Sequence, residues 1–205
     1  MIKSYTSDKI ARERRFFMPT RQSSSKTTLR RLIFSALFAA IIFVATSYLK
    51  VPLPVMGYVH LGDGIIFLAA TILPLPYAIG AAAIGAAFAD LMAGYTQYIL
   101  ATFILKALTA ACFSALKGRS VTTRNLLALI PAVILNVGGY YLFEALIYNS
   151  LVSPIANTPF NAVQSVCGVV IFILLGVMID KTRALSDIFE GIRPKKKSKN
   201  QSTKE

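Results

Sequence analysis

Charged residues are scarce in this 205-residue sequence, at 15% with a mean hydropathy of +0.60. Soluble domains carry roughly 25% charged residues, so the composition excludes an ordinary soluble protein and indicates an integral membrane protein. The chain has no tryptophan, one histidine and two cysteines. Cys112 and Cys167 lie far apart in apolar runs without metal-ligand spacing, and we interpret them as packing residues.

Motifs for catalysis and nucleotide binding are also missing. The sequence contains no G-x-x-x-x-G-K-[ST] phosphate loop, no H-E-x-x-H and no credible Ser/His/Asp arrangement. Its single histidine, His60, falls in a loop, so acid–base chemistry has few candidates. We therefore expect no enzyme activity, no cofactor and no metal site. If the protein transports a solute, it does not hydrolyse ATP itself.

The excess of basic over acidic residues, +13 in formal net charge, is confined to the ends of the chain. Residues 1–31 hold nine Lys/Arg and two acidic residues, and residues 181–205 hold eight and three. Basic tails flanking an apolar body are typical of the cytoplasmic side of membrane proteins and bind anionic lipid headgroups. We expect contact with membrane lipids here, and no nucleic-acid binding.

The apolar body predicts an all-α integral membrane protein, a bundle of six transmembrane helices over residues 29–180, with basic cytoplasmic tails at 1–28 and 181–205. A spanning helix needs about 20 mostly apolar residues, and the predicted spans are 29–49, 64–73, 77–93, 97–117, 124–148 and 159–179. We expect Gly94 to close the third span with a left-handed cap and Pro131 to kink the fifth.

Six spans place both termini in the cytoplasm, and the positive charges agree with this orientation. Lys117, Arg119 and Arg124 lie in an inner loop, whereas the opposite loops hold only Lys50. The second span is short, and a five-span alternative would put the two basic tails on opposite sides of the membrane.

Polar residues inside the spans gather in the predicted outer half. Tyr98, Thr102 and Lys106 repeat every four residues and share one helix face, and the fifth span repeats this pattern. A charged side chain in hydrocarbon costs about 2.5–3.5 kcal/mol on insertion scales, so such groups face inward and find partners. The pattern predicts an outward binding cavity rather than a pore. The candidate site residues are Lys106, Glu144, Asp90, Tyr95, Gln97, Asn136, Tyr140, Asn161, Gln164 and Asp63.

Several of these residues also have purely structural interpretations. Lys106 and Glu144 could pair only with each other, and Asp63 could only cap a helix N-terminus. Asp90 ends a helix, where the dipole disfavours an anion, so we expect a donor partner such as a tyrosine or Lys106. For Tyr98 we favour a place in the interfacial belt of aromatic residues.

Small residues repeat at helical spacing in two spans and allow close approach of helix backbones. For Ala81 and Gly85 on the third span we expect internal packing. For Ala36 and Ala40 on the first span, the same kind of face could dock a partner subunit.

Long stretches of the chain resemble a known family over about residues 29–180. The stretches are HLGDGIIFLAATILPLPYAIGAAAIGAAFADLMAGYTQYILATFILKAL, GGYYLFEALIY and TPFNAVQSVCGVVI. They are similar to the substrate-binding S components of energy-coupling factor (ECF) vitamin transporters, in the broad group that includes the riboflavin-type S components.

The resemblance implies six helices and a vitamin pocket near the outer face, partly closed by the loop between the first two helices. It implies a transmembrane coupling subunit and two cytoplasmic ATPase subunits as partners, in a bacterial plasma membrane. Ala36 and Ala40 match the family's coupling-subunit contact. The group spans several ligands, so the resemblance names none for this chain.

We therefore expect a subunit that binds a small water-soluble vitamin or precursor, of the pyridoxine, hydroxymethylpyrimidine, pantothenate or riboflavin class. Without tryptophan, a ligand ring would stack on Tyr or Phe. Two alternatives stay open. One is a proton-coupled secondary transporter working alone, and the other is a non-transport membrane scaffold.

Overall fold

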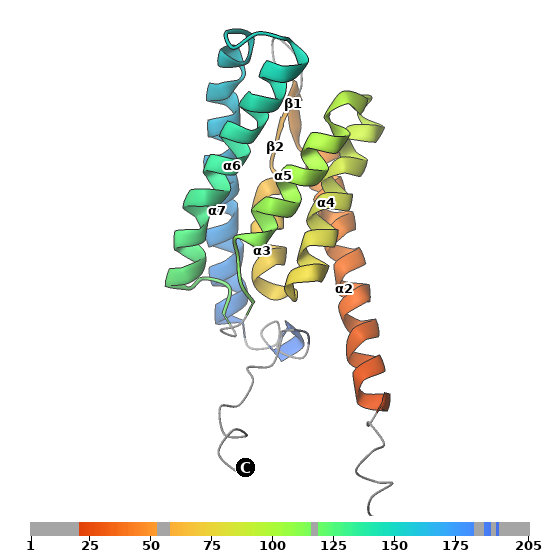
Figure 1. The fold of residues 1–205 in the computed structure, drawn as a ribbon. Helices are drawn as coiled ribbons and strands as arrows, with labels where there is room; N and C mark the ends of the chain where they lie inside the picture. The colour runs from red at the N-terminus through yellow and green to blue at the C-terminus, as the bar shows by residue number, and fades with distance from the viewer. Residues whose placement is uncertain (1–20, 53–57, 116–118, 183–186, 190–191, 193–205) are drawn as a thin grey trace, which may run out of the picture.

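The computed structural model describes residues 21–52, 58–115, 119–182, 187–189 and 192, and within them it is an almost entirely helical bundle (Figure 1). The predicted all-α class is therefore confirmed, while most of both predicted tails lies outside the described residues. The helices are α2 (Arg21–Tyr48), α3 (Gly62–Ile72), α4 (Leu75–Met92), α5 (Ile99–Ala111), α6 (Thr123–Ile147) and α7 (Thr158–Lys181), with short 3-10 helices η1 (Thr96–Tyr98) and η2 (Ser153–Ala156).

Four helices in the described part of the chain are long and apolar enough to cross a membrane. They are Ser25–Tyr48, Leu75–Met92, Thr123–Ile147 and Thr158–Lys181. The segments Gly62–Ile72 and Thr96–Ala111 are apolar but shorter. The count of six crossings and the cytoplasmic termini therefore stay predictions.

Helix α5 is shorter than the predicted span 97–117. It ends at Ala111, and Asn125 holds the chain in a non-helical path just beyond this point. The Ser114 N–H donates to Asn125 Oδ1 at 3.1 Å, and Asn125 Nδ2 donates to the Ser114 carbonyl at 3.0 Å. A buried side chain thus replaces the partners that a continuing helix would supply.

The segment between α2 and α3, expected to be a loop, contains a small antiparallel hairpin. Strand β1 (Lys50–Pro52) pairs with β2 (Tyr58–His60), with Val51 opposite Val59. Side chains two residues apart on a strand share a face, so Tyr58 and His60 project to the same side. We call the end of the bundle that carries β1 and β2 the hairpin end.

Helices α2 and α4 approach each other closely because Gly85 has no side chain. A Cβ added there would lie 2.6 Å from the carbonyl oxygen of Ala39, so the predicted internal packing of this face is confirmed. The predicted left-handed cap is also present, since Gly94 has a φ of 81°. Ala36 and Ala40 are exposed on α2.

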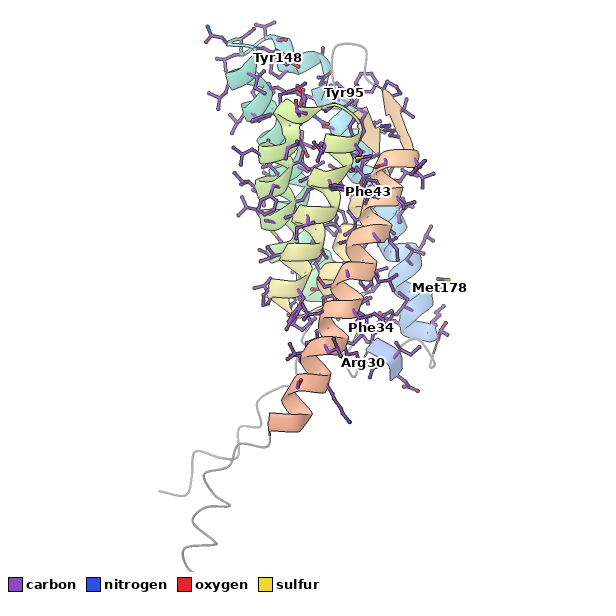
Figure 2. All side chains as sticks on the ribbon, turned by 90° about the vertical axis from the view of Figure 1, so that its right-hand side faces the viewer. Arg30, Phe34, Phe43, Tyr95, Tyr148 and Met178 are labelled. Atoms are coloured by element: carbon purple, nitrogen blue, oxygen red, sulfur yellow. The ribbon has the colours of Figure 1, made fainter. Side chains whose placement is uncertain are left out.

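The opposite end of the bundle is held by contacts of a different kind. The Asp180 carboxylate accepts from the N–H groups of Ser120 and Val121 at 2.8 and 2.9 Å. Arg30 donates to the Ile188 carbonyl at 2.9 Å, and Figure 2 shows this arginine far from Tyr95 and Tyr148. These contacts tie the backbone together at this end of the bundle.

Candidate functional site

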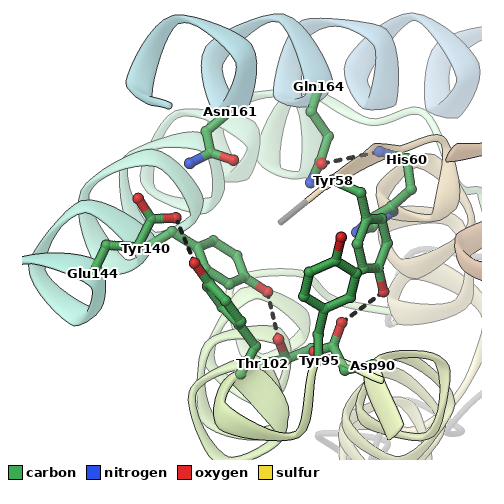
Figure 3. A pocket seen from close by; sticks show the side chains of 10 residues that line it. Tyr58, His60, Asp90, Tyr95, Thr102, Tyr140, Glu144, Asn161 and Gln164 are labelled. Carbon is green, nitrogen blue, oxygen red and sulfur yellow. Dashed lines mark hydrogen bonds between the residues drawn. The ribbon is translucent and has the colours of Figure 1, made fainter. Parts of the chain in front are cut away.

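A polar cavity opens at the hairpin end, among β2, α4, η1, α5, α6 and α7 (Figure 3). The space between its walls, counted together with the open mouth, is about 390 Å³. Ten residues line it: Tyr58, His60, Asp90, Tyr95, Tyr98, Thr102, Tyr140, Glu144, Asn161 and Gln164. Six of them were candidates from the sequence: Asp90, Tyr95, Tyr140, Glu144, Asn161 and Gln164.

Four tyrosine rings form a continuous wall around this cavity. The ring of Tyr95 lies 5.2 Å from that of Tyr58 and 6.3 Å from that of Tyr98, centroid to centroid. The Tyr98 ring lies 6.5 Å from the Tyr140 ring. Such rings offer apolar faces for stacking and hydroxyl groups for hydrogen bonds, so the wall suits a planar, polar ligand.

Asp90 contributes a buried carboxylate to one side of the cavity. Its Oδ1 accepts a hydrogen bond of 2.6 Å from the hydroxyl of Tyr58, which agrees with the expected tyrosine partner. Burial of the hydroxyl is the main cause that raises the pKa of Tyr58 well above its ordinary value, and the negative charge of Asp90 is the second. Tyr58 therefore stays protonated and acts as the donor.

Glu144 contributes a second buried carboxylate, on another side of the cavity (Figure 3). The hydroxyl of Tyr98 donates to its Oε1 at 3.3 Å, and Asn157 Nδ2 donates to its Oε2 at 3.1 Å. The interpretation of Lys106 and Glu144 as a pair is wrong. Lys106 pairs instead with a carboxylate on α3.

That partner is Asp63, beneath the cavity. Lys106 Nζ lies 2.6 Å from Asp63 Oδ1 and 2.6 Å from Asn136 Oδ1. All three side chains are at most 1% exposed, and none of them lines the cavity. The interpretation of Asp63 as only a helix cap is wrong, because its side chain makes no capping bond and instead compensates the ammonium charge.

Gln164 connects this buried ion pair to the hairpin. Its Nε2 donates to Asp63 Oδ2 at 2.8 Å, while its Oε1 accepts from the backbone N–H of His60 at 3.1 Å. We call Lys106, Asp63, Asn136 and Gln164 the buried network. It joins α5, α3, α6 and α7, and through His60 it fixes the strand that carries Tyr58.

His60 is buried, and its Nδ1 accepts from the N–H of Gly62 at 3.1 Å. Burial lowers the pKa of His60 to about 4, with Asp63 opposing and Lys106 adding to the shift. The imidazole is therefore neutral at pH 7. The described residues contain no group of three His, Cys, Asp or Glu side chains that could hold a metal ion.

Some lining residues were not candidates from the sequence, and one candidate lies elsewhere. Gln97 is exposed and does not line the cavity. Tyr98, expected in an interfacial belt, is only 6% exposed and lines the cavity with Thr102. Tyr98 and Thr102 both belong to the four-residue repeat that leads to Lys106, and this repeat was the signal in the sequence that could have made them candidates. Tyr58 and His60 depend on the hairpin, which the sequence did not predict.

These features define a helical membrane protein with a small-solute cavity at one end. The chain belongs to the family described as ECF-type riboflavin transporter, S component, which matches residues 26–181. It is therefore a membrane-embedded, substrate-binding subunit of an ECF transporter and not an enzyme.

A solved structure supports the fold assignment. It is described as "Structure and mechanism of the S component of a bacterial ECF transporter" and is 22% identical to this chain, with a TM-score of 0.54. The similarity covers 72% of this chain and 94% of that one. No curated protein sequence matches this chain.

Proposed function

We propose that this protein captures a small water-soluble vitamin or vitamin precursor in the cavity at the hairpin end, which faces the outside of a bacterial plasma membrane. The observation that carries the proposal is the cavity itself, with four tyrosines and two carboxylates at its wall. The ligand classes are pyridoxine, hydroxymethylpyrimidine, pantothenate and riboflavin, the last being named in the family description.

The proposal includes six membrane crossings with both termini in the cytoplasm. It also includes an ECF coupling subunit and two cytoplasmic ATPase subunits, which supply the energy for uptake. Ala36 and Ala40 are exposed one turn apart on α2, so a partner helix can approach this face closely. The site residues Lys106, Asp63 and Asn136 act by positioning the wall, because they lie beneath it.

Family membership favours this function over the two alternatives. A secondary transporter working alone would use Lys106, Glu144 and Asp90 as a proton relay. The ammonium group of Lys106 is instead held by Asp63 and Asn136. A scaffold would have no reason to line a cavity with ten mostly polar residues.

Native mass spectrometry and thermal-shift assays across a panel of B vitamins test the proposal. We expect the purified protein to carry, or to bind in the nanomolar to low micromolar range, one of these compounds. We also expect uptake into liposomes only when the coupling subunit and ATPases are present with ATP. Uptake by the lone protein on a pH gradient would support the secondary transporter instead.

A further inference from the structure

The charge balance at the cavity wall is negative. Asp90 and Glu144 line the cavity and are 5% and 3% exposed. Neither carboxylate forms an ion pair with any residue that the structure describes. The ion pair found there, with nitrogen and oxygen within 4.0 Å, joins Lys106 and Asp63. The partners of the two wall carboxylates are neutral groups, the hydroxyls of Tyr58 and Thr102 for Asp90 and a hydroxyl and an amide for Glu144.

Two lysines lie near the wall and act electrostatically on Asp90, but neither forms an ion pair with Asp90 or Glu144 within 4.0 Å. Lys106 is matched by Asp63, and its Nζ lies 5.2 Å from the ring centroid of Tyr140, outside the lining. Lys50 is half-buried on the hairpin, with its Nζ 5.0 Å from the ring centroid of Tyr58. His60 is neutral at pH 7, as its lowered pKa requires.

One oxygen of this wall is left without a partner. Asp90 Oδ2 is buried and has no hydrogen-bond partner among the described residues, while Oδ1 binds Tyr58. A buried carboxylate oxygen without a donor is unfavourable, since desolvation is then uncompensated. A ligand that brings an N–H donor and positive charge to this oxygen would remove that cost.

We propose, as a refinement that rests on the proposed function, that the ligand is a planar nitrogen heterocycle carrying positive charge and N–H donors. Its ring stacks on the tyrosine wall, where cation–π attraction adds to stacking. Its N–H groups donate to Asp90 Oδ2 and, on the other side, toward Glu144. The same wall disfavours a carboxylate-bearing ligand, because two carboxylates but no lysine or arginine are among the described residues that line the cavity.

Titration calorimetry on the purified full chain, after removal of any bound ligand, tests this refinement. The probes are thiamine, a permanent cation with an aminopyrimidine ring, and 4-amino-5-hydroxymethyl-2-methylpyrimidine, its aminopyrimidine part, which becomes cationic when a ring nitrogen takes up a proton. The other two probes are riboflavin, which is neutral, and pantothenate, an anion. We expect one of the first two to bind most tightly and pantothenate to bind most weakly.

Asp90→Asn and Glu144→Gln remove one charge each at nearly constant shape. Each variant is expected to weaken binding of the cationic probe at least roughly tenfold, because it removes one charge-assisted hydrogen bond. Asp187→Asn is the matched control, because Asp187 is exposed and far from the cavity. Using two wall variants keeps the test valid if one of them fails to fold.

The outcomes separate the refinement from the proposed function. Tightest binding of riboflavin or pantothenate, or unchanged affinity in folded Asp90→Asn and Glu144→Gln variants, overturns the refinement and leaves the proposed function standing. Absence of binding for every B vitamin, with no compound released from the purified protein, contradicts the proposed function and the refinement together.

Discussion

Lys106 is the ammonium group at the centre of the buried network, and its removal leaves Asp63 as an unpaired buried carboxylate. Breaking a buried ion pair from one side costs about 3–5 kcal/mol, so we expect Lys106→Met to lower the unfolding free energy by that order. The double variant Lys106→Met/Asp63→Asn removes both charges and should recover most of the loss. Equilibrium unfolding in detergent measures both variants.

The same pair of variants separates a structural role from ligand contact. Because Lys106 does not line the cavity, ligand affinity should recover together with stability in the double variant. An affinity that stays low in a double variant of restored stability would show that the ammonium group itself touches the ligand.

His60 makes stability depend on pH. Its pKa falls from 6.5 to about 4 on folding because the ring is buried. Between these values the unfolded chain binds a proton that the folded chain does not. Stability should therefore fall as the pH is lowered from 6.5 toward 4, by up to about 3 kcal/mol.

His60→Asn keeps an acceptor for the Gly62 N–H but does not titrate in this range. Melting temperatures of both proteins at pH 7, 6, 5 and 4 give the comparison. If the His60→Asn variant loses stability as steeply as the native chain when the pH falls, the pH dependence comes from other groups.

Sequence reasoning identified which residues share a helix face but not which faces meet. The four-residue repeats through Lys106 and Glu144 indicated two polar stripes at one end, and residues of both stripes line the cavity in the structure. The repeat contains no information on helix rotation, so the sequence offered Glu144 as one possible partner of Lys106 and did not indicate Asp63, which is the partner in the structure. Tyr58 depended on a strand pairing across residues 53–57 that no periodicity reveals.

The contact between α2 and α4 depends on the missing side chain of Gly85. Since an added Cβ would lie 2.6 Å from the Ala39 carbonyl oxygen, Gly85→Ala must push the two helices apart. We expect a loss of about 1–3 kcal/mol, typical of overpacking. Equilibrium unfolding in detergent measures the loss.

Gly80→Ala is the control on the same helix, because a Cβ there meets nothing within 4 Å. Its stability should be unchanged or higher, as alanine favours a helix over glycine. Equal losses in both variants would mean that the close approach of α2 and α4 is not what Gly85 provides.

The elements themselves were well predicted where apolar periodicity continues for several turns. Helices α6 and α7 begin and end close to the predicted boundaries of 124–148 and 159–179. Helix α5 was predicted too long because its apolar character continues past Ala111. The side chain of Asn125 hydrogen-bonds the backbone of Ser114, eleven residues before it, and ends the helix. The local sequence around Ala111 does not reveal this contact.

Assembly with partner subunits should depend on the exposed small face of α2. We expect Ala36→Leu/Ala40→Leu to reduce ATP-driven uptake in liposomes that also contain the coupling subunit and ATPases. Affinity for the ligand should stay unchanged, because neither position lines the cavity. Leu37→Phe, an enlargement at an exposed neighbouring position, is the control and should leave uptake intact.

The central claim is that the tyrosine wall at the hairpin end surrounds a vitamin-class ligand. Because the chain has no tryptophan, tyrosine emission can be followed directly while ligand-free protein is titrated with each B vitamin. We predict a saturable change in emission for one compound, with a dissociation constant in the nanomolar to low micromolar range. Unchanged emission across the whole panel, with no compound released from the purified protein, would contradict the claim.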